Sequence, residues 1–71
     1  MKWEGTFMET VTDIQKLLKR FGTVIYTGDR QGDLELMQDE IRELKEIGAI
    51  DSETYLKAAL ILQRRLQSGK G

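Results

Sequence analysis

The side chains best suited to chemistry in this chain are basic and aromatic, and they fall into two groups. Cations at short spacing can contact successive phosphates, and an aromatic ring beside them can stack on an unpaired base. The candidate binding residues are Lys16, Lys19, Arg20 and Tyr26 in the first group, and Arg64 and Arg65 in the second. Together they indicate recognition of single-stranded nucleic acid, if the fold brings them to one surface.

The chain contains no histidine and no cysteine, so catalysis would fall to carboxylates, lysine, tyrosine or hydroxyl groups. No such residues are arranged as a nucleophile beside a base. Asp29, Asp33 and Glu40 match the first, fifth and twelfth positions of a calcium loop, but Leu34 stands where that loop requires glycine. We therefore expect no enzyme, no metal and no cofactor.

Two glycines bracket a segment that is too apolar to be a solvated loop. Gly22 follows a helical pattern and can take the left-handed conformation that ends a helix, while Gly28 allows a sharp turn. A phosphate-binding loop would continue with Lys and Ser or Thr, where this chain has Asp29 and Arg30. We interpret both glycines as structural residues. The segment between them is then an extended linker whose apolar side chains cover the core: Val24, Ile25 or Tyr26.

With 71 residues, the chain is one domain near the lower size limit for a stable core. It has no cysteine for disulfides, so stability must come from helix packing or self-association. The absence of proline and the abundance of Leu, Glu, Lys and Gln favour helix. No apolar run is long enough to span a membrane, and residues 1–4 lack the apolar region of a signal peptide, so we expect a cytoplasmic location.

Apolar residues at helical spacing predict the first two helices. The first follows a capping box at either Thr6 or Thr10, and it ends at Gly22. Its stripe is Val11, Ile14, Leu18 and Phe21, with Leu17 beside it and Phe7 extending it backward. The second runs from about Asp29, or from Asp33 if Gly32 delays it, to Ile47. Its stripe is Leu34, Met37, Ile41 and Leu44.

A third helix is predicted over residues 52–67, after Gly48 ends the second helix and Asp51 or Ser52 caps the third. Its apolar residues fall on several faces: Tyr55, Ala59, Leu62 and Leu66 on one, Leu56 and Leu60 on a second, and Ile61 beyond them. Such a helix is expected at the centre of the bundle. We therefore predict an all-α, compact three-helix bundle over residues 10–67. Residues 1–9 form an N-terminal extension and helix start, and residues 68–71 a disordered tail.

Glu40 falls inside the apolar arc of the second helix, where an unpaired buried charge would be very costly. We therefore hypothesise that Glu40 is a structural anchor that holds the linker, accepting a hydrogen bond from the hydroxyl of Tyr26, from Thr27 or from Arg30. These donors are close in sequence, and the linker must be held somewhere.

The net charge of −1 is distributed unevenly along the chain. Residues 1–27 carry +1, residues 28–53 carry −6, and residues 54–71 carry +4. One interpretation is that the basic ends pair with the acidic middle, at about 1 kcal/mol or less for each exposed contact. The other is a basic patch for a polyanion.

Three stretches of the chain are distinctive: 22–30, 33–37 and 39–44. In them the sequence closely resembles the YqgQ-like family of small bacterial proteins of uncharacterised function, over roughly residues 10–62. The resemblance implies a compact three-helix protein and a suggested role in binding single-stranded nucleic acid, but it carries no catalytic or binding residues. Gly32 departs from the family pattern, and residues 1–7 form an extension, so that Met8 is an alternative start.

Two functions follow from these observations. The first is a small non-enzymatic module that binds single-stranded RNA or DNA through the basic face of the first helix. The second is a protein-interaction or self-associating helical module without a nucleic-acid role. In both cases we expect no membrane partner. We also expect no small-molecule substrate, because so short a chain has little room for an enclosed pocket.

Overall fold

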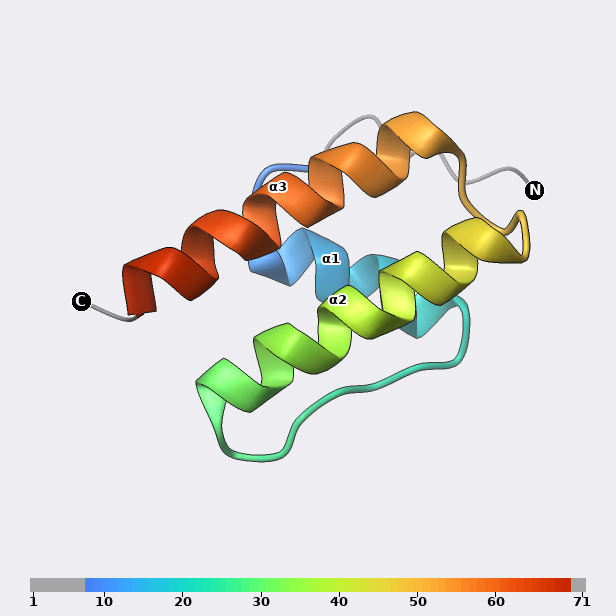
Figure 1. Cartoon of the computed structure of the whole chain (residues 1–71). Helices are drawn as coiled ribbons and strands as arrows, with labels where there is room; N and C mark the ends of the chain where they lie inside the picture. Colours follow the sequence, from blue (N-terminus) through green and yellow to red (C-terminus); the bar gives the residue numbers. More distant parts are fainter. Residues whose placement is uncertain (1–7, 70–71) are drawn as a thin grey trace.

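The computed structural model describes residues 8–69 and contains three helices, with no strand in that part of the chain. These are α1 (Val11–Arg20), α2 (Arg30–Glu46) and α3 (Ser52–Gly69). Helices α2 and α3 form an antiparallel hairpin, and α1 packs against both (Figure 1). The linker, residues 21–29, runs back along α2 in extended form. The predicted all-α three-helix bundle with an extended linker is confirmed.

Helix α1 begins with a capping box at Thr10, the second of the two predicted starts. The Thr10 hydroxyl accepts from the Asp13 N–H, and the Asp13 carboxylate accepts from the N–H groups of Glu9 and Thr10 at 2.9 and 3.1 Å. These bonds, first the one from Glu9 and then the one from Thr10, lower the pKa of Asp13 below its ordinary value. Thr6 and Phe7 lie outside the described residues.

The end of α1 is fixed by Gly22. Its φ of +85° lies in the left-handed region, and the N–H groups of Gly22 and Thr23 donate to the carbonyls of Lys19 and Leu18. This is the hydrogen-bond pattern of a Schellman motif, as predicted. Phe21 is the last residue before that turn, and it is more exposed than its place in the apolar stripe suggested.

Helix α2 starts at Arg30, so Gly32 does not delay it. Asp29 occupies the N-cap position, but its side chain makes no capping hydrogen bond. The Asp29 N–H instead donates to the Thr27 hydroxyl at 3.2 Å, within a turn in which Gly28 has a φ of +90°. The Asp29 carboxylate lies over Gly32, where an added Cβ would sit 3.0 Å from Oδ2.

The turn between α2 and α3 follows the sequence pattern closely. Gly48 and Ala49 donate to the carbonyls of Lys45 and Leu44, which closes α2 in a second Schellman motif. The Asp51 carboxylate then accepts from the Thr54 N–H at 2.8 Å and caps α3. Ile50 is buried across this turn.

The core lies between the three helices and takes one row of side chains from each. From α1 come Ile14, Leu17 and Leu18, from α2 Leu34, Met37, Ile41 and Leu44, and from α3 Ala58 and Leu62, with Met8 and Ile50 at the edges. The predicted row of α2 is confirmed, and that of α1 is confirmed for Val11, Ile14, Leu17 and Leu18 but not for the exposed Phe21.

Helix α3 differs from its prediction. Its buried row is Thr54, Ala58 and Leu62, whereas Leu56 and Leu60 project outward, so α3 does not lie at the centre of the bundle. It packs mainly against α2. The helix also continues through Ser68 to Gly69, so these two residues do not belong to a disordered tail as predicted, and residues 70–71 lie outside the described residues.

Candidate functional site

The linker is held at its far end by a buried carboxylate of α2. Both the N–H and the hydroxyl of Thr27 donate to Asp33 Oδ1, at 2.9 and 2.6 Å. Asp33 is only 8% exposed, so these bonds offset the cost of burying its charge. The predicted anchor was Glu40, which is half-buried on α2, but the acceptor that Thr27 meets is Asp33.

The side chains of the linker alternate in direction, as an extended backbone requires. Ile25 packs against the core, while Val24 and Tyr26 are 76% and 83% exposed. The prediction that the linker covers the core is therefore confirmed through Ile25 alone. Its neighbours are left free to meet a partner.

A cleft of about 380 Å³ opens where α1, the linker, the start of α2 and the end of α3 come together. Its polar lining is Thr12, Gln15, Tyr26, Arg30, Asp33 and Arg65, and its apolar wall includes Val11, Leu34 and Met37. A neighbouring hollow of about 440 Å³, here called the outer hollow, is lined by Arg30, Gln31, Leu34, Arg65 and Ser68. Arg30 and Arg65 thus border both spaces.

The structure brings together some of the predicted binding residues. Tyr26 and Arg65 line the cleft directly. Lys16 and Lys19 are exposed on α1, each one helical turn after a residue of the cleft wall, Thr12 or Gln15, but neither lysine lines the cleft itself.

Arg20 and Arg64 do not line the cleft either. Arg20 is exposed on the side of α1 that lies farther from the cleft, and Arg64 lies about 100° around α3 from Arg65. The six basic and aromatic candidates therefore do not form one continuous site.

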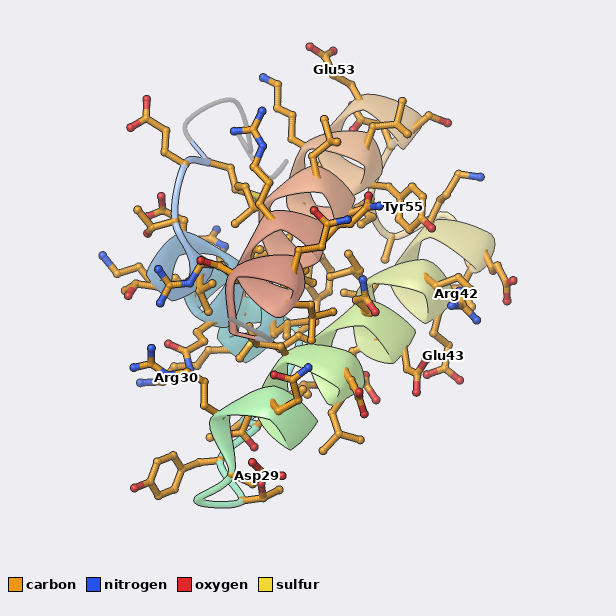
Figure 2. All side chains as sticks on the ribbon, turned by 60° about the vertical axis from the view of Figure 1, so that its left-hand side comes forward. Asp29, Arg30, Arg42, Glu43, Glu53 and Tyr55 are labelled. Carbon is orange, nitrogen blue, oxygen red and sulfur yellow. The ribbon has the colours of Figure 1, made fainter. Side chains whose placement is uncertain are left out.

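The residue that sequence reasoning missed is Arg30. Figure 2 shows its side chain on the side of α2 that faces α1, with Arg42 and Glu43 on the other side. A signal was present: Arg30 is spaced four and seven residues before the buried Leu34 and Met37, so it continues their row beyond the core.

On α2, Arg42 forms an ion pair with Asp39 at 4.0 Å. On α3, Lys57 forms an ion pair with Glu53 at 3.8 Å. The contact between Lys45 and the ring of Tyr55, 5.5 Å from its centroid, joins α2 to α3. These contacts lie outside the cleft lining. Neither Arg30 nor Arg65 forms an ion pair with any residue in the range 8–69.

The same part of the chain offers neither a metal-binding cluster nor a membrane-spanning helix. Within residues 8–69, no three His, Cys, Asp or Glu side chains gather closely enough to hold a metal ion. None of the helices described there is both long and apolar enough to cross a membrane.

Comparison with known proteins agrees with the resemblance seen in the linker and α2. The model of the YqgQ-like family matches residues 8–68. The uncharacterized protein YqgQ of Bacillus subtilis (strain 168) is 41% identical over 63 residues, which cover 89% of each chain. The chain therefore belongs to the YqgQ-like family.

Proposed function

We propose that this protein is a non-enzymatic module that binds single-stranded RNA or DNA in the cytoplasm. The observation that supports the proposal most strongly is the position of Tyr26. Its ring is freely exposed at the edge of a cleft that contains Arg30 and Arg65. An exposed aromatic face beside cations is the arrangement on which single strands stack their bases while their phosphates are neutralised.

Lys16 and Lys19 extend this surface along α1. A strand whose base stacks on Tyr26 has phosphates on either side of that base, and the two exposed lysines of α1 follow the cleft residues Thr12 and Gln15 by one helical turn. The acidic residues Asp39 and Glu43 are exposed on other faces of α2. The overall charge of −1 then reflects those faces and does not describe the cleft.

The test is a binding titration of labelled single-stranded RNA and DNA, followed by fluorescence anisotropy at two salt concentrations. Tyr26→Ala is expected to weaken binding by about 1–3 kcal/mol, the usual contribution of one stacked base. Val24→Ala is the matched control, because Val24 is an equally exposed linker residue outside the cleft lining. Binding that does not weaken as salt rises, or equal losses in both variants, would contradict the proposal.

The second candidate function is self-association through the outer face of α3. Leu56 and Leu60 lie one turn apart on that face and are both exposed. Sedimentation velocity at several concentrations tests it: a dimer that dissociates in the Leu56→Gln/Leu60→Gln variant supports self-association. A monomer at every concentration removes this candidate.

A further inference from the structure

Two arginines occupy equivalent places at the open end of the α2–α3 hairpin. Arg30 continues the buried row of α2 beyond Leu34, and Arg65 continues the buried row of α3, three residues after Leu62. Because the helices are antiparallel, the start of α2 and the end of α3 lie at the same end of the molecule (Figure 1). Both guanidinium groups therefore reach the region where the core ends, and both border the cleft and the outer hollow.

The charge around these arginines is not balanced within the cleft. Among the described residues, Asp33 is the one acidic residue in its lining, and its Oδ1 already accepts both donors of Thr27. Neither arginine forms an ion pair with another residue of the described chain. Two arginines that line the same cleft without carboxylate partners in the described chain favour an anionic ligand there.

The size and the lining of the cleft restrict the kind of molecule that can carry this anion. Its volume of about 380 Å³ is near the lower end for small-molecule sites, and Leu34 and Met37 give it an apolar wall. The ring of Tyr26 stands at its edge and Gln15 on its α1 side. A planar base that carries a phosphate fits this combination of aromatic, amide and guanidinium groups.

Building on the proposed function, we propose that the cleft recognises the phosphorylated end of a single strand. The terminal phosphate, which carries between one and a half and two negative charges near neutral pH, lies between Arg30 and Arg65. The terminal base stacks on Tyr26. The rest of the strand leaves past Lys16 and Lys19. An internal phosphodiester has one charge and two substituents, so it is a poorer ligand for a pair of arginines than a terminal phosphate is.

The experiment compares short oligonucleotides of one sequence with a phosphate at the 5′ end, at the 3′ end, or at neither end, using fluorescence anisotropy with the full chain. One of the phosphorylated strands is expected to bind at least about tenfold more tightly than the strand with two hydroxyl ends, because hydrogen bonds to a charged group are strong. Arg30→Gln and Arg65→Gln should each remove this preference. Arg42→Gln is the matched control on α2, since Arg42 lies outside the cleft and should leave the preference unchanged.

Competition experiments distinguish recognition of a whole nucleotide from recognition of its phosphate alone. A nucleoside monophosphate is expected to displace the phosphorylated strand at lower concentration than inorganic phosphate does. Equal binding of all three strands would overturn end recognition but leave the proposed function standing. Equal competition by inorganic phosphate would overturn the part played by Tyr26. The absence of binding by any strand would overturn the proposed function itself, and end recognition with it.

Discussion

Thr27 donates two hydrogen bonds to the same carboxylate oxygen of Asp33, one from its N–H at 2.9 Å and one from its hydroxyl at 2.6 Å. Through this pair the end of the linker is fixed to the first turns of α2. Because Tyr26 directly precedes Thr27 in the linker and Asp33 lines the cleft, the same contact positions the exposed ring beside the arginines.

Thr27→Val removes the hydroxyl donor while keeping the branched shape of the side chain. We expect the free energy of unfolding to fall by about 1.5–3 kcal/mol, since a hydrogen bond to a buried carboxylate is lost. Urea denaturation measures this change. Thr23→Val is the control, because the contact shown for Thr23 is a backbone hydrogen bond to Leu18, and it should alter stability by no more than about 0.5 kcal/mol. Similar losses in the two variants would contradict the anchoring role of Thr27.

The capping box of α1 predicts a dependence on pH. Hydrogen bonds from the N–H groups of Glu9 and Thr10 lower the pKa of Asp13 in the folded state. A carboxylate with a lowered pKa stabilises the fold above its unfolded pKa, and this contribution is lost as pH falls through the folded pKa. An NMR titration of the Asp13 carboxyl carbon should therefore give a midpoint below the usual aspartate range. The stability difference between the wild type and Asp13→Asn should shrink on acidification, and a constant difference would contradict the capping role.

Replacing each of two glycines by alanine is expected to change the stability of the protein in opposite directions. Gly22 has a φ of +85°, so Gly22→Ala should destabilise the protein by about 1–2 kcal/mol, the cost of left-handed backbone for a residue with a Cβ. Gly32 lies inside α2 with ordinary helical backbone, and its neighbour is the end of the exposed Asp29 side chain, which can move. Gly32→Ala should raise stability by about 0.5–1 kcal/mol. Thermal unfolding compares the two, and equal effects would contradict the difference in backbone conformation.

The two leucines on opposite sides of α3 test which face is buried. Leu62 is fully buried and Leu60 is 54% exposed. Leu62→Ala should cost about 2–5 kcal/mol, which is enough to unfold much of so small a domain, whereas Leu60→Ala should cost under about 1 kcal/mol. Denaturation curves of both variants decide this. A large loss for Leu60→Ala would instead show that its face is covered by a second copy.

The sequence predicted the fold well where local rules decide it. Gly22 and Gly48 close helices in the left-handed conformation, and Asp51 caps α3, because each effect depends on residues a few positions apart. In α3, apolar residues lie on several faces, so spacing alone did not identify the buried one. The small Ala58 belongs to the buried row, because a short side chain allows α2 and α3 to approach closely.

The candidate site was harder to predict because it is formed by residues distant in sequence. Arg30 and Arg65 meet at one end of the hairpin only because α2 and α3 are antiparallel. Tyr26 was a candidate from its chemistry, but its exposure depends on the phase of the linker, which Ile25 and Thr27 set by packing and hydrogen bonding. Asp33 was not predicted as the anchor, although it lies nearer than Glu40 to the buried row of α2 and is the more deeply buried of the two.

The central claim is that the cleft between α1, the linker, the start of α2 and the end of α3 binds single-stranded nucleic acid. An amide NMR titration with a short single strand tests it most directly. The claim predicts that the largest shift changes occur at Gln15, Tyr26, Arg30 and Arg65 and that the outer face of α3 stays unchanged. Shift changes concentrated around Leu56 and Leu60, or no changes at a saturating concentration of the strand, would contradict it.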